Sequence, residues 1–254
     1  MLHDTARAKL NLTLEVRGRH PDGFHELESL VAFADFGDAV ELEPGEDLDL
    51  VIDGPFAQGL STGANLILEA AKAAKAMCPD LALGRFRLTK ELPIAAGLGG
   101  GSADAAAALR LIARANQGKL SPDVLKDIAA KLGSDVTACL KSKPALMTGR
   151  GEQVSEISGF PVCGVLLANP GVELSTAKVY AALDAALLGA MPASTDLAQF
   201  DGDFERLIEY ARARPNDLEA PVLRLAPIIG DVLAALVGLD GVRLARLSGS
   251  VISR

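Results

Sequence analysis

The chain has 254 residues, of which 49% are hydrophobic and 23% are charged, and its formal net charge is −8. This composition is typical of a globular protein with a large core, and the excess of acidic residues disfavours binding to nucleic acid. The apolar stretches are too interrupted to span a bilayer and the N-terminus carries no apolar leader, so we expect a cytoplasmic protein with no membrane partner.

The first half of the chain predicts short strands that alternate with helices. Polar and apolar residues alternate over 9–16, which indicates a half-buried strand. The predicted elements that follow are strands at Leu27–Phe33, Ala39–Leu42 and Leu48–Ile52, a helix at Asn65–Met77, and a strand at Phe86–Lys90. Two more helices are expected, one from Ser102 to about Ala115 and one over Pro122–Leu132, with Ser121 as its cap and Gly133 at its end.

The second half predicts strands at Ala145–Gly151, Gly164–Ala168 and Val242–Leu247, and helices at Ala177–Leu187, Phe204–Ala213 and Val222–Val237, the last interrupted by proline. Paired strands followed by isolated helices favour an α+β fold. A boundary near 140–143 divides the chain into domains 1–143 and 144–254. The three cysteines have no CxxC spacing, so we expect buried thiols at Cys78, Cys139 and Cys163.

The most informative segment is LPIAAGLGGGSADAAAA at residues 92–108, where a glycine-rich loop leads into a run of strong helix formers. Glycine tolerates positive φ and leaves backbone N–H groups accessible, and the following helix N-terminus attracts anions. The loop therefore predicts a phosphate site, with a tight strand-to-helix turn or a flexible linker as the alternative. It lacks the lysine of a Walker loop, and the dinucleotide pattern GxGxxG fits no better.

Three separated segments together resemble the GHMP kinases. They are ARAKLNLTLEVRGRHPDGFHELESL at 6–30, the glycine loop, and KLGSDVTACL followed by ALMTGRGEQVSEI at 131–157; NPGVELSTAKVY at 169–180 and NDLE at 216–219 extend the likeness. The DGFHEL and GSDV segments resemble the motifs of one branch of this family, whose members phosphorylate a cytidine-diphosphate-linked polyol. The resemblance implies an ATP-dependent kinase with an N-terminal domain like domain 2 of ribosomal protein S5 and a C-terminal ferredoxin-like α/β sandwich.

By this resemblance, Asp135 is the general base beside the substrate hydroxyl, and Lys9 lies near both Asp135 and the transferred phosphate. Such a pair suits phosphoryl transfer, which depends on positioning and on charge neutralisation. Without the resemblance, Asp135 would be interpreted as a turn or cap residue and Lys9 as a solvated strand lysine.

The resemblance also implies a nucleotide site that holds ATP with Mg²⁺. The expected contacts are Pro93, Gly97, Leu98, Gly99, Gly100, Gly101 and Ser102 around the phosphates, the Ser102 hydroxyl near the metal, and Asn65 and Lys90 at the adenine end. Asp104 could be a metal ligand, but it is as readily a charge at the start of the helix.

For the substrate, Phe24 and Tyr180 are expected to stack on cytosine while His25 bonds its edge. Thr176 is also placed in the substrate site, and Asn11 near the diphosphate or the polyol hydroxyls. The alternative for the two aromatic residues is an ordinary core position. We expect a monomer or a homodimer.

The end of the chain departs from the family pattern. Residues 247–250 read LSGS, similar to the third glycine-rich motif of the family, and 251–254 are unrelated to it. This pattern predicts a truncated C-terminal domain and reduced activity. The alternatives to the proposed kinase are another small-molecule GHMP kinase and a nucleotide-binding protein without catalysis.

Overall fold

The structure is a computed structural model that describes residues 1–94, 96–172, 174–187 and 198–249. Its contacts divide the chain into two compact units. Unit 1 comprises Met1–Lys9, Phe33–Ile94 and Gly99–Ser142, and unit 2 comprises the described parts of Leu10–Ala32, Ala95–Leu98 and Lys143–Arg254. The division differs from the predicted 1–143 and 144–254 because strands β1 (Leu2–Asn11) and β3 (His25–Glu43) each contribute residues to both units.

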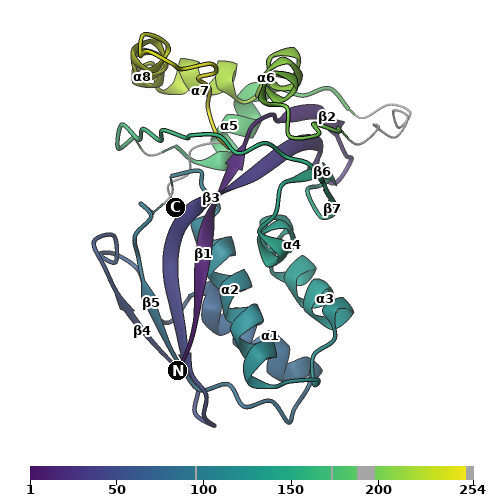
Figure 1. Ribbon diagram of the computed structural model, residues 1–254, viewed down its shortest axis with the longest axis vertical. Helices are drawn as coiled ribbons and strands as arrows, with labels where there is room; N and C mark the ends of the chain where they lie inside the picture. The colour runs from purple at the N-terminus through teal and green to yellow at the C-terminus, as the bar shows by residue number, and fades with distance from the viewer. Residues whose placement is uncertain (95, 173, 188–197, 250–254) are drawn as a thin grey trace. The chain divides into compact units, whose positions relative to one another are not determined.

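Unit 1 is a layer of strands covered on one face by helices (Figure 1). Strand β4 (Asp49–Asp53) pairs in parallel with β5 (Arg85–Thr89), which pairs antiparallel with the second half of β3. Strand β1 also pairs with β3. The helices are α1 (Leu66–Met77), α2 (Gly100–Ala115), α3 (Pro122–Leu132) and α4 (Ser134–Lys141).

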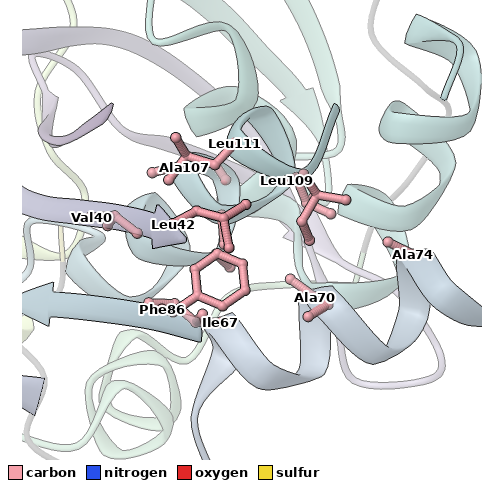
Figure 2. Close-up of a cluster of buried hydrophobic side chains, with 14 of the residues drawn as sticks. Val40, Leu42, Ile67, Ala70, Ala74, Phe86, Ala107, Leu109 and Leu111 are labelled. Atoms are coloured by element: carbon pink, nitrogen blue, oxygen red, sulfur yellow. The ribbon is translucent and has the colours of Figure 1, made fainter. Parts of the chain in front are cut away.

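The core of unit 1 lies between these two layers (Figure 2). The ring of Phe86 from β5 lies beside Leu42 of β3 and Ile67 of α1, and all three side chains are buried. Alanines such as Ala70 and Ala107 occupy the facing sides of α1 and α2, and their small side chains let these two helices approach closely. The core thus holds α2, which begins at the end of the glycine loop, against the sheet.

Unit 2 is built on the first half of β3. This segment pairs antiparallel with β2 (Glu15–Arg19) and with β6 (Ala145–Gly149), and β7 (Gln153–Glu156) pairs with β6. The helices are α5 (Thr176–Leu183), α6 (Phe204–Ala213), α7 (Glu219–Leu225) and α8 (Ile228–Val237). One apolar cluster joins Val179 of α5 to Leu218, Val222 and Leu247.

The predicted α+β class is confirmed, as are several helices with clear caps. The side chains of Asn65, Ser121 and Asp203 accept hydrogen bonds from the first turns of α1, α3 and α6. Helices α3 and α6 have the predicted bounds. These are the helices whose start signals are local, because a capping side chain satisfies backbone groups within its own turn.

Several strand predictions are wrong for reasons of pairing. The strands predicted at 27–33 and 39–42 belong to one strand, β3, since Gly37 does not break it but leaves room for β1: a Cβ there would lie 2.0 Å from the carbonyl oxygen of Ala6. The strand predicted at 9–16 is interrupted between β1 and β2. The segments 164–168 and 242–247 form no strand in the described chain, because an apolar or alternating pattern alone supplies no hydrogen-bonding partner.

Other differences concern short or terminal features. Helix α4 and strand β7 were not predicted, and α5 ends at Leu183 rather than 187. The proline interruption expected within 222–237 is confirmed at Pro227, which separates α7 from α8, but α7 begins earlier than predicted, at Glu219. Of the three cysteines expected to be buried, Cys163 is exposed and Cys78 is intermediate. In the described residues, no helix is both long and apolar enough for a membrane span.

Candidate functional site

The glycine loop ends in an uncapped helix. Helix α2 begins at Gly100, two residues before the predicted Ser102, because Gly99 adopts the left-handed conformation (φ 64°) and serves as the N-cap. The first helical bond runs from the N–H of Ala103 to the carbonyl of Gly99 at 2.8 Å, and no side chain among the described residues caps this end. The N–H groups of the first turn, which includes Ser102, therefore suit an anionic ligand.

Lys9 and Asp135 meet at this helix start. The Lys9 Nζ atom lies 3.2 Å from Asp135 Oδ1. A Cβ added to Gly99 would lie 3.3 Å from Lys9 Cε and 3.8 Å from Asp135 Oδ2, so the pair contacts the end of the loop. Three positions from three separate sequence motifs are thus neighbours within unit 1.

The two members of the pair differ in exposure. The Lys9 side chain, on β1, is 4% exposed, which argues against a solvated strand lysine, whereas the Asp135 side chain is 41% exposed. Asp135 lies in the first turn of α4, where the helix dipole favours a carboxylate. The arrangement presents a carboxylate to solvent, beside a buried cation and an uncapped helix N-terminus.

A second lysine lies near the same helix start but is enclosed. Lys90 Nζ donates to Asp38 and, at 3.0 Å, to Asp104 Oδ2, and all three side chains are buried. Asp38 Oδ1 also accepts the N–H groups of Glu91 at 2.7 Å and Leu92 at 2.8 Å. A Cβ on Gly100 would lie 3.4 Å from Lys90 Nζ, so this cluster underlies the first turn of α2.

Burial sets the protonation of this cluster. It raises the pKa of Asp104 to about 8; the Lys90 charge opposes this rise and the Asp38 charge adds to it. Burial alone would lower the pKa of Lys90, but the two carboxylates outweigh it and the pKa is raised. One buried ammonium faces two carboxylates, which favours a proton on Asp104.

These contacts change the interpretation of three predicted residues. The Lys90 ammonium is engaged by two buried carboxylates, so it supports the helix start, and its expected contact with the adenine end stays a prediction. Asp104 is enclosed with it rather than presented to a metal. Asn65 Oδ1 accepts the N–H of Ile67 at 2.9 Å as the cap of α1. Within the described residues, no group of three or more His, Cys, Asp or Glu side chains is arranged to hold a metal.

The predicted substrate residues of unit 2 include one ring pair. The rings of His25 and Tyr180 lie 4.6 Å apart between centroids with an interplanar angle of 32°. Burial, then the charges of Arg19 and His20, lower the pKa of His25. The imidazole is therefore neutral near pH 7 and offers one donor and one acceptor. Thr176 begins α5 one turn before Tyr180, so the two share a helix face.

Phe24 lies beneath an arginine in this structure. The guanidinium of Arg150 lies 4.7 Å above its ring centroid, and Phe24 remains 59% exposed. Arg150 is itself paired with Asp22 at 2.5 Å. In this structure Tyr180 contacts His25 and Phe24 contacts Arg150, so the expected pairing of Phe24 and Tyr180 around a base stays a prediction.

Asn11 is buried in a network that the sequence did not indicate. Its Nδ2 donates to Ser29 Oγ at 2.7 Å, and its backbone N–H donates to Ser248 Oγ at 3.0 Å. Next to Ser248, a Cβ on Gly249 would lie 2.8 Å from the carbonyl oxygen of Gly97, which places the turn 247–249 against the loop. Pro93 is half-buried and Leu98 buried.

The sequence matches the family described as GHMP kinases N terminal domain over residues 65–143. A crystal structure of homoserine kinase from Cytophaga hutchinsonii is similar over 96% of this chain and 80% of that chain, with a TM-score of 0.62 and 17% identity. At that identity the likeness shows the fold alone, which is that of the GHMP kinases.

Curated relatives narrow the family. The chain is 47% identical over 261 residues to a 4-diphosphocytidyl-2-C-methyl-D-erythritol kinase of Rhodopseudomonas palustris, covering 98% of this chain and 85% of that protein. It is 46% identical to an enzyme of that name from Methylorubrum extorquens, covering 98% and 87%. A crystal structure of 4-(cytidine 5'-diphospho)-2C-methyl-D-erythritol kinase matches with a TM-score of 0.70 and 30% identity, covering 98% and 87%. The chain belongs to this family of GHMP kinases.

Proposed function

We propose that the protein transfers the γ-phosphoryl group of ATP to the 2-hydroxyl of 4-diphosphocytidyl-2-C-methyl-D-erythritol, in the methylerythritol phosphate route to isoprenoid precursors. The names of the relatives support the substrate. The observation that carries the chemistry is the Lys9–Asp135 pair, at 3.2 Å, against Gly99 at the start of α2.

In the proposed reaction, the substrate oxygen forms a bond to the γ-phosphorus while the bond from that phosphorus to the bridging oxygen breaks, and ADP leaves. Asp135 takes the hydroxyl proton, which its exposed carboxylate can reach in a bound substrate. Lys9 offsets the charge on the transferred group, and the first-turn N–H groups of α2 hold the phosphates. The loop residues Gly97, Leu98, Gly99, Gly100, Gly101 and Ser102 supply this cradle, and Pro93 precedes it.

We place Mg²⁺ with ATP, near Ser102. The absence of a cluster of acidic ligands in the described chain is compatible with this ion, which commonly uses one or two protein ligands together with phosphate oxygens and water. The half-buried Ser102 hydroxyl in the first turn of α2 suits such a ligand. When bound, the ion neutralises phosphate charge and favours the in-line arrangement.

For base recognition, the neutral His25 imidazole supports hydrogen bonding to a cytosine edge, and Phe24 and Tyr180 supply apolar faces for stacking. Thr176 and Asn11 are proposed substrate contacts on the same unit. Asn65, through groups other than its capping oxygen, and Lys90 are proposed contacts at the adenine end of the nucleotide.

The test is release of ADP from Mg-ATP with the cytidyl substrate, run beside mevalonate, homoserine and galactose. The proposal expects turnover with the cytidyl substrate alone. Turnover with another acceptor instead would favour a different GHMP kinase. A folded protein that binds ATP and releases no ADP with any acceptor would favour a nucleotide-binding role and contradict the proposal.

A matched pair of variants tests the base contact. Phe24→Ala is expected to raise the KM for the cytidyl substrate about tenfold, the scale of one lost stacking contact, and to leave the KM for ATP unchanged. Phe56, also exposed (40%), lies in unit 1, and Phe56→Ala is expected to change neither constant. Equal effects of the two variants would count against Phe24 as a base contact.

A further inference from the structure

A buried asparagine holds the turn 247–249 in place. Asn216 lies between α6 and α7 and is 4% exposed. Its Nδ2 donates to the carbonyl oxygens of Leu247 at 3.0 Å and Gly249 at 3.1 Å, and its Oδ1 accepts the N–H of Leu218 at 2.9 Å. Both amide hydrogens are thus directed at two carbonyls of one turn, which fixes that turn relative to the start of α7.

The same turn has two further anchors. The N–H of Leu247 donates to Glu219 Oε2 at 3.0 Å, and the Leu247 side chain packs in the cluster that contains Leu218. Ser248 Oγ accepts the backbone N–H of Asn11 at 3.0 Å. The turn is therefore bonded on one side to the NDLE segment and on the other to the end of β1.

The anchored turn contacts the glycine loop closely, backbone against backbone. Gly249 has φ 68° and Gly97 has φ 73°, so both take a conformation that other residues rarely adopt. The site of a Gly249 Cβ lies 2.8 Å from the Gly97 carbonyl oxygen, which leaves no room for a side chain between the two backbones. A displacement of the turn would therefore release or shift Gly97.

We propose that Asn216 is a positioning residue for nucleotide binding. It acts through the turn 247–249, which holds Gly97 and so preserves the shape of the loop for the phosphates of ATP. This inference rests on the proposed function, because it takes the glycine loop as the phosphate site. Asn216 itself has its polar groups bonded to backbone and serves the reaction indirectly.

The test is Asn216→Asp. The substitution keeps the shape and the oxygen that accepts from Leu218, but it replaces the donating NH₂ by an oxygen facing two carbonyl oxygens. We expect the dissociation constant for Mg-ATP, measured by calorimetry without the second substrate, to rise at least tenfold. The KM for ATP should rise with it, while the KM for the cytidyl substrate stays within twofold.

Asn116 offers a matched control. It is 5% exposed at the end of α2, its Nδ2 donates to the carbonyls of Ala82 at 2.7 Å and Ile112 at 3.0 Å, and its Oδ1 accepts the N–H of Ala82 at 2.8 Å. Asn116→Asp breaks the same kinds of bond, but its bonded partners, Ala82 and Ile112, lie outside the glycine loop and outside the turn 247–249. It should lower the melting temperature comparably and leave ATP affinity unchanged.

Equal effects on ATP affinity in the two variants, or none in either, would overturn the inference. If Asn216→Asp does not fold, Ser248→Ala provides the readout, since it removes only the acceptor for Asn11 and should weaken ATP binding two- to fivefold. Unchanged affinity in a folded Ser248→Ala would then count against the proposal. A wild-type protein that binds ATP but does not phosphorylate the cytidyl substrate would refute the proposed function and leave this comparison valid.

Discussion

Two lysine–aspartate groups lie at the start of α2, and they differ in what surrounds them. Lys9 pairs with Asp135, whose side chain is 41% exposed. Lys90 faces two aspartates, Asp38 and Asp104, whose side chains are 0% and 6% exposed. One group contacts Gly99 and the other Gly100, so they are adjacent at the same helix end.

The difference in exposure distinguishes the Lys9–Asp135 pair, which we propose acts in the reaction, from the Lys90 cluster, which supports the structure. A carboxylate that reaches solvent can receive a substrate proton, whereas one enclosed with its cation can only hold the structure. Without Lys9, the charge of Asp135 remains hydrated. Without Lys90, the carboxyl groups of Asp38 and Asp104 remain buried with no cation beside them. The two lysines should therefore respond oppositely to the same substitution.

The largest expected effect is on the turnover of Lys9→Met. Loss of the cation beside the transferred phosphate should lower kcat about 10³-fold, which is the scale of one lost electrostatic stabiliser. The free energy of unfolding should change by less than about 1 kcal/mol, because Asp135 stays hydrated. ADP-release kinetics and urea unfolding measure the two quantities. A kcat within threefold of wild type would remove Lys9 from the mechanism.

Lys90→Met should show the reverse pattern. It leaves Asp38 and Asp104 buried without a cation, and the expected loss of unfolding free energy is about 3–5 kcal/mol. Urea unfolding at pH 7 measures this loss. A stability equal to that of Lys9→Met would show that the two groups are not distinguished by burial.

The pH dependence of stability should sharpen the comparison further. The folded pKa of Asp104, about 8, exceeds its usual value of 3.8, so between these values the folded state binds more protons than the unfolded state. The free energy of unfolding should therefore fall as pH rises from about 4 to 8, by at most about 1.4 kcal/mol per pH unit from this group. Urea unfolding at pH 5.5 and 7.5 tests this, and Asp104→Asn should reduce the fall. Parallel curves for the two proteins would contradict the assignment.

The smallest expected effect concerns Gly99, the glycine that Lys9 and Asp135 contact. Gly99→Ala and Gly118→Ala both place alanine at positive φ, 64° and 79°, and each should cost about 1–2 kcal/mol of stability. Only at Gly99 does the new Cβ meet Lys9, whereas no atom of the described residues lies within 4 Å at Gly118. The KM for ATP should therefore rise several-fold in Gly99→Ala alone, as measured by initial rates. A similar rise in Gly118→Ala would point to strain and not to contact.

The sequence predicted features whose cause is local and missed those set by tertiary pairing. The helices α1, α3 and α6, each capped by a side chain in its own first turn, were predicted, and the glycine loop marked the start of α2 within two residues. The partners of Lys90 could not be predicted, since Asp38 is 52 residues away and meets it only through the pairing of β3 with β5. The segment 242–247, VRLARL, has the alternation of a strand, yet strand formation depends on a hydrogen-bonding neighbour that periodicity does not reveal.

The residues of the candidate site, likewise, could be predicted from the sequence only in part. Lys9 and Asp135 were placed by resemblance of their motifs, and the structure brings them to 3.2 Å. The role of Asn216 was not predicted, because an asparagine that bonds to backbone carbonyls leaves no periodic or spacing signal. Its segment, NDLE, resembled the family, but the resemblance did not say what the side chain contacts.

The most direct test of the account is the rate of phosphoryl transfer by Asp135→Asn at saturating Mg-ATP and cytidyl substrate, with the dissociation constant for ATP measured on the same sample. The account predicts that kcat falls at least about 10²-fold through loss of the general base, while ATP affinity stays within twofold. A kcat close to wild type would show that this exposed carboxylate does not take the proton, and would contradict the distinction between the two lysine–aspartate groups.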